Sequence, residues 1–468
     1  MSLVVENGSF RDPSGVVFYR DGQVYRHVQN SYQENYDLLM LSGLYSNLIK
    51  AQLLVNHSEV ENQELSSANA YRTLQPDMIS YISYPYEWSF SQLKDAALTT
   101  LKIQKLAIEF GMSLKDASAY NIQFQNGKPI FIDTLSFEKY VEGSPWVAYK
   151  QFCEHFLAPL ALMSRTDIRL GQLLRNNLDG IPLDLASKLL PKLSLLNSGL
   201  LTHLHLHGAA SKRFEGKSQS AEAIANRVSK TAMLGLVDNL ETTIKKLTWL
   251  PYGTTWADYY QETNYSDPAM DSKKRLVGRM LDSVTPTPKS VWDLGANTGV
   301  FSRIANERGF DVIAWDIDPA AVERNYLDCK AGRGSNLLPL MIDLTNPSPD
   351  QGWALQERRS YTGRGLPDVA MALALIHHLA IGNNVPLKKT ASFFSALGKW
   401  LIIEFVPKSD SQVKRLLAAR EDVFPNYDLE HFERDFEFHF EIVMKAPVLE
   451  SERTLFLMRN LSCVDVDR

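Results

Sequence analysis

Short apolar runs that end in an acidic or polar residue recur along the second half of the chain. Stretches with apolar residues at three- and four-residue steps lie between them. The runs expected to form strands cover residues 291–294, 312–315, 338–342, 368–373 and 400–405, and the intervening helices cover 319–326 and 385–397. Regular alternation of strand and helix predicts an α/β fold with a doubly wound, Rossmann-like parallel sheet.

The first half of the chain has a different pattern. Two β-like runs, 16–19 and 23–28, flank Asp21-Gly22, a pair typical of a tight hairpin turn. A long helical pattern over 34–57, an alternating stretch over 78–84 and a helix over 91–110 closed by Gly111 follow. We therefore predict an α+β domain over 1–210, a helical linker over 211–250 and the α/β domain over 251–468.

The first strand of the α/β domain ends in Asp293 and breaks into a turn containing Gly295, Asn297 and Gly299. Missing side chains let a cofactor approach the backbone at the carboxyl end of a strand. A pyrophosphate-binding turn has glycine where Asn297 stands, and Asp293 makes the mouth of this turn negative. A cofactor that carries an ammonium and a sulfonium but no phosphate suits this turn better.

This turn resembles motif I of the class I methyltransferases that depend on S-adenosylmethionine (SAM). The resemblance covers residues 250–460 and implies a seven-stranded sheet whose last two strands, expected at 436–444 and 453–459, form an antiparallel hairpin. It also implies that Asp293, Gly295, Asn297 and Gly299 hold the methionine part of SAM. Asp316 and Asp343, which close the second and third strands, would then bind the ribose and the adenine.

Three side chains, two just past the fourth predicted strand and one within the fifth, are candidate catalytic groups. His377 or His378 could take a proton from an oxygen or nitrogen acceptor, because imidazole titrates near neutral pH. One histidine could equally cap the next helix while the other packs in the core, and Glu404 is a second candidate base. The segments 372–379 and 402–410 also resemble a methyltransferase subgroup that includes a rhizobial host-specificity nodulation protein.

The first half contains Asp116 and Asn121, then a predicted hairpin at Asn126-Gly127, and then Asp133. This spacing resembles the catalytic loop and metal-binding Asp of protein and aminoglycoside kinases. Arg26 is the residue that could stand for the strand lysine, and no glycine-rich phosphate loop is visible. The resemblance implies a degenerate kinase-like domain that does not transfer phosphoryl groups, in which Asn121 and Asp133 could share a magnesium ion. An unrelated α+β domain is the alternative.

Composition restricts the partners. The 468 residues carry a formal net charge of −5, with a pI of about 6.1, which argues against general nucleic-acid binding. Three distant cysteines indicate neither a disulfide framework nor a zinc cluster, and no signal peptide or membrane span is evident. We expect a cytoplasmic protein with no membrane partner. The composition does not determine its oligomeric state.

Two further groups of side chains could bind a ligand, and we assign a ligand to neither. His203, His205 and His207 could hold a metal at helical spacing, but no acid or cysteine flanks them, and we assign no metal. An aromatic cluster at Trp256, Tyr259, Tyr260 and Tyr265 could pack over a sulfonium or simply fill a domain seam.

The sequence thus predicts a SAM-dependent methyltransferase that modifies an oxygen or nitrogen nucleophile, and nothing in it names the acceptor. Two alternatives remain: a SAM-sensing interaction protein without turnover, and a nicotinamide-dependent oxidoreductase.

Overall fold

The computed structural model describes residues 3–61, 65, 67, 69–209, 228–254, 266–418 and 421–463. The chain forms two compact units. The first contains residues 1–249 together with 350–359, and the second contains residues 250–349 and 360–468. The short segment 350–359 therefore lies between two stretches of the second unit along the chain but belongs to the first unit.

An antiparallel five-stranded sheet opens the first unit, in the order β1-β2-β3-β5-β4. Its strands are β1 (Val4–Val5), β2 (Gly15–Arg20), β3 (Gln23–Gln29), β4 (His57–Glu59) and β5 (Ala70–Pro76). The predicted hairpin is confirmed, because Arg20 pairs with Gln23 and both Asp21 and Gly22 have positive φ.

Two expectations for this region are wrong. The helix expected over 34–57 is two helices, α1 (Gln33–Leu41) and α2 (Leu44–Lys50), because Gly43 adopts a left-handed conformation with φ of 84°. The alternating stretch 78–84 forms no strand, and the neighbouring residues 70–76 form β5 instead. Tyr81, Ser83 and Tyr84 are all buried in this irregular backbone, so burial here does not follow the alternation of a strand.

The longest helix, α3 (Phe90–Glu109), agrees with its prediction to within a residue. Ser89 and Gln92 form a capping box at its start, and Gly111 follows its end with φ of 76°. Two short antiparallel pairs follow, formed by β6 (Met112–Leu114) with β9 (Phe137–Lys139) and by β7 (Ile122–Gln125) with β8 (Lys128–Phe131). The predicted hairpin at 126–127 is therefore confirmed.

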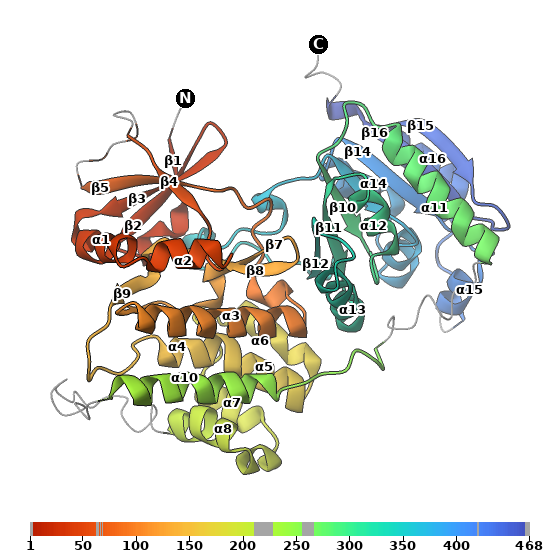
Figure 1. The fold of residues 1–468 in the computed structure, drawn as a ribbon. Coiled ribbons are helices and arrows are strands. Elements are labelled where there is room, and N and C mark those ends of the chain that lie inside the picture. The colour runs from red at the N-terminus through yellow and green to blue at the C-terminus, as the bar shows by residue number, and fades with distance from the viewer. Residues whose placement is uncertain are drawn as a thin grey trace. The chain divides into compact units, whose positions relative to one another are not determined.

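The rest of the first unit is helical. Its helices are α4 (Tyr149–Phe152), α5 (Ala158–Arg165), α6 (Leu173–Asn176), α7 (Leu183–Leu189), α8 (Ser198–Leu200) and α10 (Lys230–Lys245). The region predicted as a linker, 211–250, is not a separate linker in its described part, because α10 packs along α3 within the first unit (Figure 1). Residues 210–227 lie outside the described residues.

The second unit has a seven-stranded sheet in the order β12-β11-β10-β13-β14-β16-β15. Its strands are β10 (Ser290–Leu294), β11 (Asp311–Asp316), β12 (Leu337–Met341), β13 (Val369–Ala372), β14 (Trp400–Phe405), β15 (Phe440–Pro447) and β16 (Thr454–Asn460). Strands β10 to β14 are parallel, and β16 runs antiparallel to both of its neighbours. This is the predicted Rossmann-like sheet with a terminal hairpin.

Strand order reverses at β10, since the chain builds outward to β12 on one side and then returns to β13 on the other. Right-handed crossovers therefore place helices on both faces. Those helices are α11 (Asp267–Asp282), α12 (Val300–Asn306), α13 (Pro319–Lys330), α14 (Leu387–Ser395), α15 (Ser411–Leu417) and α16 (Leu429–Glu437). A ligand crevice is expected at such a reversal, at the carboxyl ends of the strands.

One predicted boundary in the second unit is wrong, namely the start of the strand expected at 436–444. Residues 436 and 437, expected to open a strand, close α16 instead, and β15 begins at Phe440. Phe432 and Phe436 are both buried at helical spacing, so the apolar residues that suggested a strand belong to a helix face.

Segment 350–359 is inserted between β12 and β13 and packs within the first unit. Glu357 accepts hydrogen bonds from Arg11 Nε at 2.9 Å and Nη2 at 3.1 Å, and from the Trp353 amide at 2.6 Å. Arg358 lies 4.3 Å from the centre of the Tyr120 ring. These contacts fix the segment to residues near the start of the chain.

Candidate functional site

The turn after β10 contains three left-handed residues, Gly295, Asn297 and Gly299. Gly295 has φ of 78° and Asn297 has φ of 51°. The amides of Gly295 and Ala296 both donate to the carbonyl oxygen of Trp315 at 2.9 Å, which fastens the turn to the end of β11. A Cβ at Gly295 would lie 3.3 Å from Leu375 Cδ1. The turn therefore presents bare backbone to the space in front of it.

Asp293 and Asp316 lie buried beside this turn. Ser302 Oγ donates to Asp293 Oδ2 at 2.6 Å, while Asp316 accepts from the backbone amides of Asn297 at 2.7 Å and Asp318 at 2.8 Å. Burial raises the pKa of each carboxyl to about 6, against the hydrogen bonds that lower it. The two acids therefore change charge close to neutral pH.

Asp343 follows β12, and its Oδ1 accepts from both the amide and the hydroxyl of Thr345, at 2.8 and 2.6 Å. It is partly exposed, in contrast to Asp293 and Asp316. The three acids therefore stand at the ends of three adjacent parallel strands, β10, β11 and β12.

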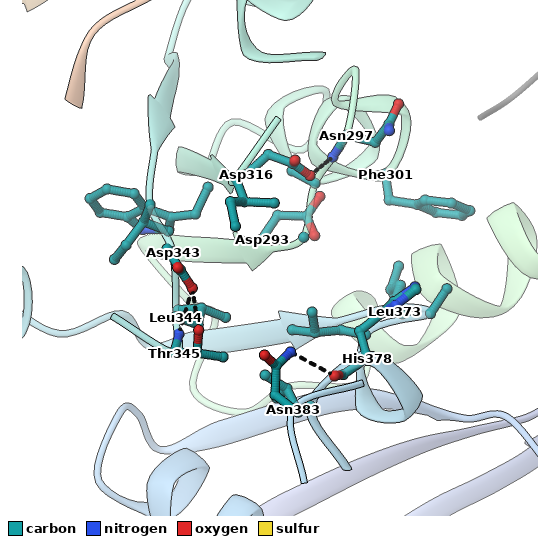
Figure 2. Close-up of a pocket in the computed structure, with 18 of the residues that line it drawn as sticks. Asp293, Asn297, Phe301, Asp316, Asp343, Leu344, Thr345, Leu373, His378 and Asn383 are labelled. Carbon is teal, nitrogen blue, oxygen red and sulfur yellow. Dashed lines mark hydrogen bonds between the residues drawn. The ribbon is translucent and has the colours of Figure 1, made fainter. Parts of the chain in front are cut away.

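These residues line one pocket of about 270 Å³. Figure 2 shows Asp293, Asp316 and Asp343 along one side, with His378 and Asn383 below them in this view. Asn383 donates to the His378 carbonyl oxygen at 2.9 Å. The remaining described lining residues are mostly apolar: Met270, Ala296, Phe301, Trp315, Ile317, Ile342, Leu344, Leu373, Ala374, Leu375 and Leu379. The pocket therefore combines an apolar lining with an acidic edge.

The structure brings six of the nine predicted site residues to this pocket: Asp293, Gly295, Asn297, Asp316, Asp343 and His378. Gly299 is not among the lining residues. A Cβ on it would stand 2.5 Å from the Asn325 side chain, so its missing side chain makes room for α13 rather than for a ligand.

His377 and Glu404 are also absent from the lining. His377 is buried behind His378, with their ring centres 4.1 Å apart. Glu404 is fully buried and accepts from Lys273 Nζ at 2.7 Å. Neither side chain lines the pocket to act as a base. Of the three candidates, His378 is the one among the lining residues.

Lys273 and Ser302 are site residues that the sequence reasoning missed. Lys273 lines the pocket, and Ser302 holds Asp293. A signal for Lys273 exists in α11, where Ala269, Lys273 and Val277 are buried at four-residue steps. A lysine in the middle of a buried stripe is unusual, because lysine is almost never fully buried without a partner.

The kinase-like residues of the first unit do form one network. Asn121 Nδ2 donates to Ser136 Oγ at 3.1 Å, and Ser136 Oγ donates to Asp133 Oδ2 at 2.7 Å. Arg26 forms ion pairs with both Asp133 and Asp12. Arg26 thus supplies to Asp133 the positive charge that the shared magnesium ion was expected to supply.

Two of the three neighbouring histidines, His203 and His205, lie on the helical turn Leu201–Leu206, and His207 follows its end. His203 bonds to Tyr149 and Asn239, His205 bonds to two serines, and His207 stacks on Tyr149. Within the described residues, no group of three or more His, Cys, Asp or Glu side chains could hold a metal ion.

Two further expectations concern membrane-spanning helices and the aromatic cluster. No helix in the described part of the chain is long and apolar enough to cross a membrane. The aromatic cluster at 256–265 lies outside the described residues.

Comparison with known proteins identifies the family. No family model matches the chain. Nodulation protein NoeA of Rhizobium meliloti (strain 1021) is 36% identical over 456 residues, which cover 96% of this chain and 94% of the relative. The chain belongs to the NoeA family of nodulation proteins. The match with NoeA spans both units of this chain.

Solved structures give slighter likenesses. Magnesium protoporphyrin IX methyltransferase (ChlM) from Synechocystis PCC 6803 with bound SAH is 16% identical, with a TM-score of 0.31, over 44% of this chain and 92% of that chain. The bifunctional kinase-methyltransferase WbdD is 15% identical, with a TM-score of 0.30, over 47% of this chain and 45% of that chain. Both likenesses are too slight to assign an activity to this chain.

Proposed function

We propose that this NoeA-family protein binds SAM in the pocket of its second unit and transfers the methyl group to an oxygen or nitrogen nucleophile. The observation that carries the proposal is the placement of Asp293, Asp316 and Asp343 at the carboxyl ends of β10, β11 and β12, around one pocket at the strand-order reversal. Carboxylates in these positions accept hydrogen bonds from an ammonium, from ribose hydroxyls and from an adenine amino group.

The charges of the pocket favour SAM over a nicotinamide cofactor. Three of its described lining residues are aspartates, and a pyrophosphate close to them would meet like charge. The turn at Gly295 offers bare backbone, as either cofactor requires. The acidic lining therefore favours SAM over a nicotinamide cofactor in this proposal.

Bound SAM would supply a methyl group already attached to a good leaving group. The chain must then position the acceptor and exclude water. Met270, Phe301, Leu375 and Leu379 provide apolar walls for that purpose.

His378 is the residue we assign to the acceptor. Burial lowers its pKa to about 4, so the imidazole is neutral at pH 7 and can accept a hydrogen bond. A base this weak orients a hydroxyl or amine and receives its proton only as the nucleophile becomes acidic during methylation. His377 stays a core residue in this assignment.

Calorimetric titration tests the proposal. SAM and its product S-adenosylhomocysteine should bind the purified full-length protein with micromolar affinity, and NAD should not bind. Incubation with labelled SAM and fractionated lysate should then transfer label to an acceptor. NAD binding without SAM binding would overturn the proposal, and SAM binding without transfer to any fraction would favour a SAM-sensing protein.

We also propose that the first unit does not transfer phosphoryl groups. Arg26 replaces the strand lysine, and it is held by Asp133 and Asp12 rather than left to bind phosphates. Lys115 Nζ bonds to Ser14 Oγ at 2.5 Å in the same network. The charged groups of the kinase-like site satisfy one another.

A further inference from the structure

Lys273 is buried, and burial of a charged side chain carries a large desolvation penalty. Its side chain is 3% exposed and its partner, Glu404, is 0% exposed, with Nζ and Oε2 2.7 Å apart. Desolvation of two charges commonly cancels their attraction, so such a pair is weak evidence for a stabilising role. The pair therefore calls for a functional explanation.

The surroundings of Lys273 connect it to the pocket. Its Nζ lies 4.7 Å from the centre of the Phe301 ring, and both residues line the pocket together with Asp293. Burial lowers the pKa of Lys273 below its ordinary value, and the carboxylates of Glu404 and Asp293 offset only part of that shift. Among the described lining residues, Lys273 is the one lysine or arginine, against three aspartates.

The amino-acid end of SAM carries an ammonium and a carboxylate on the same carbon. Asp293 complements the ammonium, and a carboxylate beside it requires a cation in a pocket whose other charges are negative. We infer that Lys273 binds the carboxylate of the cofactor, and that Glu404 is a positioning residue that holds the lysine for this contact. The inference rests on the proposed function.

This arrangement explains why lysine sits on the buried face of α11. The helix carries Lys273 to the pocket from one side of the sheet, while β10 carries Asp293 to it at the strand end. Lys273 and Asp293 then come from separate elements, and they bind the carboxylate and the ammonium of the same amino-acid group. A ligand that lacks the carboxylate would lose the contact with Lys273, and one that lacks the ammonium would lose the contact with Asp293.

The test compares two ligands that differ only by the carboxylate: SAM and decarboxylated SAM. Calorimetry on the full-length wild-type protein should give SAM an affinity about 10–100-fold higher than its decarboxylated analogue. Lys273→Met should reduce the ratio to about 1–3, by weakening SAM and sparing the analogue. Lys274→Met is the matched control, since Lys274 is exposed, pairs with Asp271 and is absent from the lining; it should keep the wild-type ratio.

Lys273→Met leaves Glu404 buried without its lysine, which could unfold the protein. The double variant Lys273→Met/Glu404→Gln removes both charges, keeps similar volumes and should show the same loss of discrimination. An unchanged ratio in a folded variant, or an equal loss of both ligands, would overturn the inference. Failure of wild-type protein to bind either ligand would instead overturn the proposed function.

Discussion

Asp316 holds the turn as well as facing the pocket. Its two oxygens accept the amides of Asn297 and Asp318, which leaves their outer lone pairs for ligand hydroxyls. We expect Asp316→Ala to weaken SAM binding about 10–100-fold by calorimetry. Asp311→Ala, at the exposed start of the same strand, should leave the affinity unchanged. Equal effects of the two changes would place the ligand elsewhere.

The raised pKa of Asp293 predicts an unusual pH dependence. A carboxyl whose pKa rises from 3.8 unfolded to about 6 folded binds its proton more tightly in the folded state. Its stabilising contribution is therefore present below pH 4 and is lost as the pH rises through 6. Asp293→Asn should become more stable than the wild type by about 1–3 kcal/mol between pH 4 and 7, measured by urea unfolding without ligand. A constant difference across that range would contradict the assignment.

SAM binding should show the opposite trend, because the ammonium requires ionised Asp293. We expect the Kd of the wild-type protein to rise about tenfold for each pH unit below 6, and the Kd of Asp293→Asn to be weak and nearly independent of pH. Calorimetry between pH 5 and 8 measures both. A wild-type Kd that is flat across this range would show that Asp293 does not face the ammonium.

The two adjacent histidines should behave differently. His378→Ala is expected to lower turnover about 10²-fold or more while SAM affinity changes less than about twofold, because His378 faces the acceptor. His377→Ala should instead lower the melting temperature, since it removes a buried ring. Label transfer to the acceptor fraction and thermal unfolding together check this. Loss of turnover in His377→Ala alone would reverse the assignment.

At the scale of elements, strands were predictable because local sequence determines them. The runs before Asp293, Asp316 and Asp343 are apolar, short and closed by acids, so strand ends and pocket residues could be read together. Helix breaks were harder: Gly43 divides one helical pattern into two, and the buried faces of α16 resembled a strand. In both cases the spacing of the apolar residues was compatible with more than one secondary structure.

The pairings across the sequence could not be predicted. Lys273 and Glu404 are 131 residues apart, and Arg26 and Asp133 are 107 apart. No local pattern links such partners, since the fold alone brings them together. The sequence therefore predicted Glu404 and Gly299 as site residues from their positions along the chain. In the structure Glu404 pairs with Lys273 and Gly299 makes room for Asn325, and neither lines the pocket.

The kinase-like network makes a prediction about the elements that carry it. Asp133→Ala would remove one of the two acidic partners of buried Arg26 and leave it with Asp12; it should destabilise the first unit by about 2–4 kcal/mol, while the affinity for SAM stays unchanged. Chemical unfolding and calorimetry measure the two effects. Wild-type protein should hydrolyse no ATP above background. Magnesium-dependent phosphorylation abolished by Asp116→Ala would show an active kinase.

At the scale of the whole molecule, Glu357 is one of several residues that attach segment 350–359 to the first unit. Its carboxylate side chain is 2% exposed and accepts three hydrogen bonds. Glu357→Ala should cost about 1–3 kcal/mol and lower the melting temperature by a few degrees, as scanning calorimetry would measure. Asp184→Ala, which removes an exposed pair with Lys188, should have almost no effect. Similar shifts in both variants would deny the segment a structural role.

The same segment sets the order in which the protein can be completed during its synthesis. Domains usually fold from the N-terminus while the ribosome is still adding residues. Residues 1–249 emerge first, but the last ten residues of their unit follow about 110 positions later, inside the other unit. At typical elongation rates the first unit waits roughly 5–20 s for Glu357. During that interval Arg11 lacks its buried acceptor, so the first unit can be completed only after about half of the second unit has been synthesised.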